Sequence, residues 1–313
     1  MSVDENRVVL ITGASTGFGR LMAEALADEG FQVFATMRDI AGRNAQNRAD
    51  IEAAASNKNV ALHVMEMDVT SDSSVQACVA GVLSRTGKID VVINNAGLVA
   101  NGVTEAFTAE EFRSVFETNS FGVVRVNRAV LPAMRRRRSG LLVHISSGAG
   151  RVVLPYSAPY CASKFALEAL ADTYRFELAP FGVDSIIVEP GVFRTEIFQK
   201  STQPADTARS AEYEGANYRS RIDKGFEQAL NDPEATDPAE VVRAVIRLIG
   251  MPAGQRPLRT LVGAAVQAMS PYNELAEKYR AGLARAFGIE NLLTLDTAGD
   301  SLPIRTDLAS GPS

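Results

Sequence analysis

The chain has 313 residues, of which 46% are hydrophobic and 22% charged, a composition typical of a globular protein rather than a disordered one. Its net charge of −5, from 32 basic and 37 acidic residues, gives no general reason to bind nucleic acid. Two cysteines (Cys78, Cys161) and two histidines (His63, His144) exclude a disulfide framework and a histidine-rich metal site, so we expect no metal.

No targeting or membrane segment is predicted. The first apolar run, VVLITG, follows the acidic and polar start MSVDENR, whereas a signal peptide begins with a basic region. No stretch reaches the roughly 18–20 apolar residues that span a bilayer. We therefore expect a cytoplasmic protein with no membrane partner.

Short apolar runs alternate with helical patterns along the chain. The runs predict strands at 7–12, 31–37, 59–69, 89–97, 140–147, 183–191 and 257–264. Helices are predicted at 18–30, 73–87, 108–138, 157–180 and 237–250, with a capping box of Thr108 and Glu111 on the third and Asp237 as the cap of the last. Such alternation indicates an α/β fold with a seven-stranded parallel sheet and helices on both faces.

Two segments stand outside this alternation, although we expect residues 1–313 to form a single domain. Residues 192–236 are long and polar and carry scattered aromatic side chains, which predicts a lid over a substrate. The aromatic residues are Phe193, Phe198, Tyr213, Tyr218 and Phe226. Residues 270–313 are predicted to add a C-terminal helical extension, with one helix at 273–288, and a polar tail.

A glycine-rich segment, TGASTGFG at 12–19, joins the first strand to the first helix. Its glycines allow a tight turn and a close backbone approach, and the helix amino terminus offers N–H groups to a pyrophosphate. In this position the segment predicts a Rossmann-type dinucleotide site rather than an empty turn. Residues 13–17 also match the G-x-S-x-G hydrolase elbow, but His63 comes too early and His144 lies inside a strand, which disfavours that alternative.

Tyr160 and Lys164 are four residues apart and therefore share one helix face. Their neighbours on the helix, including Ala162, Phe165 and Leu167, are packing residues. A lysine extended to solvent beside a half-buried tyrosine would explain an isolated pair of this kind. The rest of the chain favours a different interpretation.

Four motifs occur in a fixed order: T-G-x-x-x-G-x-G (12–19), N-N-A-G (94–97), Ser147 and Y-x-x-x-K (160–164). In this order, with 13 residues from Ser147 to Tyr160, the chain resembles the short-chain dehydrogenase/reductase family over roughly residues 7–265. The stretches VFATMRD and YCASKFALEAL look most like its 17β-hydroxysteroid and retinol dehydrogenase branch.

The resemblance implies an oxidoreductase that moves hydride between a nicotinamide cofactor and a ketone or secondary alcohol. Tyr160 would be the general acid and base, with its pKa lowered toward neutrality by the Lys164 ammonium. Ser147 would orient the carbonyl, and Asn119 would hold a proton-relay water. The residues expected to bind the cofactor are Gly13, Ser15, Thr16, Gly17, Phe18, Gly19, Arg38, Asp68, Val69, Asn95, Ala96, Gly97, Tyr160, Lys164, Pro190, Gly191, Val192 and Thr195.

The end of the second strand predicts NADP(H) in preference to NAD(H). Met37 stands where an NAD-selecting carboxylate usually lies in this family, and Arg38 follows it with a guanidinium suited to a 2′-phosphate. Asp39 is close enough to pair with Arg38 or to reach the ribose instead.

Substrate and assembly are predicted more coarsely. The apolar side chains at 152–154, together with Tyr156, favour a bulky apolar ketone such as a steroid, retinoid or aryl ketone. We expect a homodimer or homotetramer through the helices at 108–138 and 157–180. A nucleotide-binding regulatory protein without turnover is the alternative, and sugar epimerase or dehydratase chemistry is a weaker one.

Overall fold

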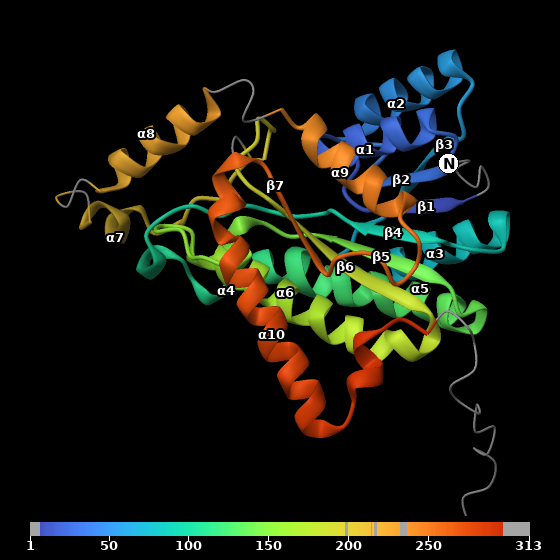
Figure 1. Cartoon of the computed structure of the whole chain (residues 1–313). Coiled ribbons are helices and arrows are strands. Elements are labelled where there is room, and N and C mark those ends of the chain that lie inside the picture. The colour runs from blue at the N-terminus through green and yellow to red at the C-terminus, as the bar shows by residue number, and fades with distance from the viewer. Residues whose placement is uncertain (1–6, 198–199, 214, 216–217, 232–236, 297–313) are drawn as a thin grey trace, which may run out of the picture.

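The computed structural model describes residues 7–197, 200–213, 215, 218–231 and 237–296. It confirms the predicted sheet, whose seven strands are all parallel in the order β3-β2-β1-β4-β5-β6-β7 (Figure 1). The strands are β1 (Val8–Ile11), β2 (Gln32–Met37), β3 (Leu62–Glu66), β4 (Val91–Asn94), β5 (Gly140–Ile145), β6 (Val183–Pro190) and β7 (Arg259–Val262).

Successive residues of a strand point to opposite sides of the sheet. Because the residues on both sides are apolar here, helices cover both faces. Val9 of β1 packs in the core beneath α1 (Gly17–Asp28), α2 (Ala45–Lys58) and α9 (Ala239–Gly250), which lie above the sheet in Figure 1. Leu10 belongs to the opposite core with α3 (Asp72–Thr86), α5 (Gly122–Arg137) and α6 (Ala158–Leu178). The other helices are α4 (Ala109–Phe116), α7 (Thr207–Ala211), α8 (Tyr218–Leu230) and α10 (Ser270–Phe287).

The strand order reverses between β1 and β4. The chain runs outward from β1 to β2 and β3 and then returns to place β4 on the other side of β1. In open parallel sheets of this kind, the carboxyl ends of the strands form a crevice at the reversal. The glycine loop after β1 and Asn95 after β4 both lie there.

One helix was missed and two predicted helices need refinement. Helix α2 was not predicted, and its buried side chains are Ile51 and Ala55, too few for a clear periodic pattern. The predicted helix at 108–138 keeps its capping box of Thr108 and Glu111, but a π-helical turn (Glu117–Phe121) separates α4 from α5. Helix α9 begins at Ala239, whose N–H donates to Asp237 Oδ1 at 2.9 Å.

The segment at 192–236 contains helices α7 and α8. Phe193 is 2% exposed and meets the Phe18 ring edge-on, with 5.6 Å between ring centroids, so it is a core residue and not part of a lid. Phe198 and the tail from residue 297 lie outside the described residues. No helix among the described residues is long and apolar enough to cross a membrane.

Candidate active site

A cavity of about 590 Å³ opens at the carboxyl ends of the central strands. Twelve of the residues predicted to bind a cofactor line it: Gly13, Ser15, Thr16, Gly17, Phe18, Arg38, Asp68, Val69, Asn95, Ala96, Gly97 and Thr195. The structure therefore brings together residues from the ends of β1, β2, β3, β4 and β6 in one place.

The glycine loop is shaped by close backbone contacts. Gly13 has a φ of +67°, and a Cβ there would lie 2.7 Å from Ala96 Cα. Gly19 packs inward, since its Cβ would lie 2.4 Å from the Gly13 carbonyl oxygen. Asn95 Nδ2 donates to the carbonyls of Thr12 and Gly13 at 2.9 and 3.0 Å. Among the described residues no side chain caps α1, which leaves its first N–H groups facing the cavity for an anion.

The far end of the cavity, beyond β2, is basic. Arg38 and Arg43 both line it. Asp39 takes a left-handed φ of +52°, and its carboxylate accepts the Arg43 backbone N–H at 2.9 Å, so it stabilises its own turn. Burial raises the pKa of Asp68, but hydrogen bonds from Thr70 and the charges of Arg38 and Arg43 outweigh it and lower the pKa overall. Arg43 was not predicted, because it precedes the helix that sequence patterns missed.

Tyr160 and Lys164 lie near the start of α6. Lys164 Nζ donates to the Ile145 carbonyl at 2.8 Å and lies 5.9 Å from the centroid of the Tyr160 ring. Burial raises the pKa of Tyr160 to about 12, and a hydrogen bond with Ser147 opposes that rise. The prediction that Lys164 brings this pKa near neutrality is therefore wrong for the protein's own groups. Burial also lowers the pKa of Lys164 to about 8, against the charge of Glu168.

Ser147 and Asn119 are both held by backbone groups. Ser147 Oγ accepts the Ala149 N–H at 3.1 Å, while the same side chain contacts Tyr160. Asn119 lies in the π-helical turn, a feature frequent at functional sites. Its Nδ2 donates to the Leu98 carbonyl and to Ser163 Oγ, both at 2.9 Å, and its Oδ1 accepts the Leu98 N–H at 2.7 Å. The Asn119 side chain therefore fixes the cavity wall.

Gly97 joins the cavity to the Tyr160–Lys164 pair. Gly97 itself lines the cavity. A Cβ on Gly97 would lie 3.5 Å from Asn119 Oδ1 and 3.7 Å from Lys164 Nζ. The ammonium group is therefore close to the cavity wall at this point.

The turn after β6 is held by the C-terminal part of the chain. The Gly191 N–H, between Pro190 and Val192, donates to the Val262 carbonyl at 2.9 Å. Val266 Cγ1 would lie 2.7 Å from a Cβ on Gly148 and 3.4 Å from one on Gly191. The segment after β7 thus packs on both the Ser147 loop and the Pro190–Gly191 turn.

The segment after that turn passes over the glycine loop. Thr195 Cβ would lie 3.7 Å from a Cβ on Gly17. Lys200 Nζ donates to Thr16 Oγ1 at 3.2 Å and also lines the cavity. Lys200 was not predicted, because nothing in the local sequence distinguishes it from a solvated lysine.

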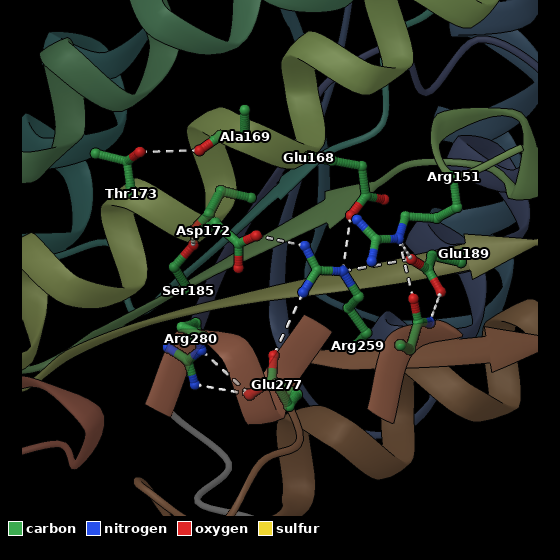
Figure 2. Close-up of polar contacts among 12 residues, drawn as sticks. Arg151, Glu168, Ala169, Asp172, Thr173, Ser185, Glu189, Arg259, Glu277 and Arg280 are labelled. Carbon is green, nitrogen blue, oxygen red and sulfur yellow. Dashed lines mark hydrogen bonds and ion pairs between the residues drawn. The ribbon is translucent and has the colours of Figure 1, made fainter. Parts of the chain in front are cut away.

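Arg259 of β7 is surrounded by four carboxylates, two buried and two partly exposed, here called the Arg259 cluster (Figure 2). Its side chain is 4% exposed and pairs with Glu168 Oε2 at 2.9 Å and Asp172 Oδ2 at 2.5 Å on α6. It also reaches Glu189 Oε1 of β6 at 3.5 Å and Glu277 Oε1 of α10 at 3.4 Å. The cluster ties α6, β6, β7 and α10 together, and its Glu168 lies one turn of α6 beyond Lys164.

Asn273 of α10 extends this cluster. Its Nδ2 donates to Glu189 Oε2 at 2.6 Å, and its Oδ1 accepts the Arg151 Nε–H at 3.0 Å. The C-terminal extension therefore contacts the residue that precedes Pro190 and the loop that follows Ser147. No sequence motif indicated this cluster.

The apolar side chains predicted to line a substrate pocket are not among the residues that line the cavity at the glycine loop. Val153, Leu154 and Tyr156 line a separate groove of about 370 Å³ with Phe165 and other residues of α6. Val152 and Val153 are 52% and 68% exposed. The groove also includes Cys161, next to Tyr160, and the role of this stretch in a substrate pocket stays a prediction.

His144 is a sheet residue, as predicted. Burial and the Lys164 charge lower its pKa to about 3, so it stays neutral. Its Nε2 lies 3.3 Å from Ser185 Oγ, and its ring stacks on Tyr174. Cys78 is a buried core residue.

The fold and the site together define a dinucleotide-binding α/β enzyme. A family model described as short chain dehydrogenase matches residues 7–206, and the chain belongs to this family. It is an oxidoreductase of a fold that binds a nicotinamide cofactor.

Similar proteins extend over most of the chain. Human retinol dehydrogenase 8 is 35% identical over 258 residues, covering 81% of this chain and 80% of its own. Mouse 17-beta-hydroxysteroid dehydrogenase type 1 is 36% identical over 258 residues, covering 80% and 72%. The crystal structure of a single-residue variant of actinorhodin polyketide ketoreductase with NADPH has a TM-score of 0.69 at 29% identity, covering 85% of this chain and 99% of that one.

Proposed function

We propose that the protein is an NADP-dependent oxidoreductase that transfers hydride between nicotinamide and a bulky, apolar ketone or secondary alcohol. The observation that carries this proposal is the Tyr160–Lys164 pair, in which Lys164 is 5% exposed and its ammonium would lie 3.7 Å from a Cβ added to cavity-lining Gly97. The names of the retinol and hydroxysteroid dehydrogenase relatives support an apolar substrate. Oxidation of NADPH across a panel of steroid, retinoid and aryl ketones tests it, and turnover on none of them would contradict it.

In the proposed mechanism, Tyr160 gives its phenolic proton to the carbonyl oxygen during reduction. A pKa of about 12 keeps the phenol protonated near neutral pH, which suits this direction. Ser147, in contact with Tyr160, would donate to the same carbonyl oxygen and stabilise its developing charge. Lys164 would stabilise the phenolate that remains. A bound nicotinamide dinucleotide supplies the hydride.

The residues around the cavity fit such a cofactor. The glycine loop leaves no side chain at positions 13 and 17, and the uncapped start of α1 suits a pyrophosphate. Lys164 would bind the nicotinamide ribose, and Pro190, Gly191, Val192 and Thr195 would hold the ring. Asn119 would hold a proton-relay water, and its side chain also positions Leu98 and Ser163.

Arg38→Ala should lose about tenfold or more in kcat/KM with NADPH and little with NADH. The guanidinium would pair with the 2′-phosphate, a charge-assisted contact worth about 1.5–3 kcal/mol. Arg48→Ala is the matched control, because Arg48 pairs with Glu52 on the exposed face of α2. Steady-state kinetics with both cofactors provide the measurement. Equal impairment with both, or a wild type that prefers NADH, would overturn the NADP assignment.

We also propose that part of the segment at 192–236 closes over the substrate. Its first half is attached to the body, since Thr202 N–H donates to the Val99 carbonyl at 2.8 Å and Asn101 N–H to the Thr202 carbonyl at 3.0 Å. Closure would therefore involve α7 and α8, whose described side chains are mostly exposed.

Trypsin should cut the free protein first near Arg209 or Lys224 and more slowly with NADP and a competitive ligand. Both residues lie beyond the β-bridge of Thr202, on the exposed helices α7 and α8, where trypsin can cut once the helix opens locally. Mass spectrometry of the first fragments locates the cuts. Equal cleavage rates in both states would count against a lid.

Assembly as a homodimer or homotetramer through the helices at 108–138 and 157–180 stays a proposal. Phe121 and Phe165 support it, because they are 48% and 38% exposed on these helices. Location in the cytoplasm also stays a prediction.

A further inference from the structure

The catalytic face of α6 continues beyond Lys164. Tyr160, Lys164, Glu168 and Asp172 follow each other at four-residue spacing and therefore lie on one face of the helix. Lys164 and Glu168 are 5% and 2% exposed. The first two residues form the proposed reaction pair, and the next two bind Arg259.

Glu168 faces charged groups from several elements. Glu189 of β6, Arg259 of β7 and Arg151 after β5 all act on its carboxyl group. Ser146, the residue before Ser147, lies beside Glu168. Both side chains pack against Gly150, since a Cβ added to Gly150 would lie 2.8 Å from Ser146 Oγ and 3.1 Å from Glu168 Cγ. Figure 2 shows Glu168 pointing toward the Arg259 guanidinium.

Lys164 faces few charges. On its own helix the neighbours are Tyr160 and Glu168, and from β5 they are the Ile145 carbonyl and the neutral His144. Asn119 approaches it across Gly97. Among the described residues, the carboxylate that raises the pKa of Lys164 is Glu168.

The two groups change charge in adjoining ranges of pH. Burial, with the charge of Glu189, raises the pKa of Glu168 to about 7. Burial lowers the pKa of Lys164 to about 8. The charge of an ionised Glu168 opposes the effect of burial on Lys164 and favours its ammonium form.

We propose that Glu168 is a positioning residue that, held by Arg259, keeps Lys164 in its ammonium form during the reaction. This inference rests on the proposed function of the Tyr160–Lys164 pair. It assigns the Arg259 cluster a second role besides joining helices. Because Glu277 and Asn273 of α10 belong to the same network, the C-terminal extension would also influence the charge on Lys164.

Glu168→Gln tests the proposal by removing the charge while keeping the shape. The matched control is Asp172→Asn, which removes the other α6 carboxylate on Arg259 one turn farther from Lys164. The chain has six lysines, so Lys164 is readily followed by NMR of ¹³C-labelled lysine and assigned with Lys164→Arg. Without cofactor, the pKa of Lys164 should fall by about one unit or more in Glu168→Gln, as expected for a charge about 6 Å away. In Asp172→Asn it should stay close to the wild-type value.

Activity should follow the titration. The alkaline limb of the kcat/KM profile should move to lower pH in Glu168→Gln, because Lys164 then loses its proton at a lower pH. Glu168→Asp keeps the negative charge and should return the limb to its wild-type position. In the wild type itself, the Lys164 signal should show a step near pH 7 as Glu168 ionises. That measurement needs no variant and applies even where Glu168→Gln does not fold.

An unchanged Lys164 titration in Glu168→Gln, an equal shift in Asp172→Asn, or no step in the wild type would overturn the proposal. If Glu168 had only a structural role, Glu168→Gln would lower the melting temperature and leave the alkaline limb of the kcat/KM profile where it is in the wild type. If Lys164 titrates as expected but Tyr160→Phe keeps its activity, the proposed function fails and the electrostatic link stands.

Discussion

Replacing Tyr160 with phenylalanine should lower turnover by about 10²–10⁴-fold and leave NADPH affinity nearly unchanged. The substitution removes the hydroxyl that contacts Ser147 and that would give the proton in the proposed mechanism, and it keeps the half-buried ring. The measurements are kcat for ketone reduction and the Kd of NADPH from its fluorescence.

Tyr174→Phe is the matched control for this experiment. Tyr174 lies on the same helix, is partly buried and stacks on His144, away from the cavity. Its loss should leave turnover close to that of the wild type. A Tyr160→Phe protein that kept more than about a tenth of wild-type turnover would contradict the general-acid role.

Arg259→Met should destabilise the protein by about 3–5 kcal/mol, because it leaves buried carboxylates without their counter-ion. Glu168 and Glu189 are 2% and 0% exposed and would have to be neutralised or reach water. Urea denaturation gives the change in the free energy of unfolding. The loss should be smaller at pH 5 than at pH 8, since both carboxyl groups have raised pKa values and protonate as the pH falls.

Arg243→Met provides the comparison. Arg243 is 64% exposed and lies 3.5 Å from Asp237, and an exposed pair of this kind contributes about 0–1 kcal/mol. Similar losses in the two variants, or a loss below about 1 kcal/mol for Arg259→Met, would show that the cluster contributes little to stability.

The sequence predicted every strand of the sheet, because each parallel strand is a compact apolar run buried on both faces. It missed α2, whose buried residues are Ile51 and Ala55, since a helix that contributes so little to the core leaves no clear apolar period. It also treated 108–138 as one helix. A π-helical turn adds a single residue to a turn and leaves no distinct pattern of residue types.

The residues around the cavity were predictable where they sit on motifs. The glycine loop, the segment at 94–97 and Thr195 line the cavity as expected. Lys200 and Arg259 were missed because their contacts, to Thr16 and Glu168, span 184 and 91 residues. The pKa of Tyr160 was misjudged for a related reason. Four-residue spacing placed an ammonium nearby but could not show how far the phenol is removed from water, and it is burial that raises its pKa.

The position of Arg259 in the chain has a consequence for biosynthesis. The carboxylates of Glu168, Asp172 and Glu189 leave the ribosome well before the arginine that neutralises them, and Val266 follows later still. Domains usually begin to fold during translation, amino-terminal part first. Here α6 and β6 cannot be buried at low cost until residue 259 has emerged. We therefore expect a nascent chain that lacks β7 to leave these acids in water, so that the proposed reaction centre forms only when synthesis is nearly over.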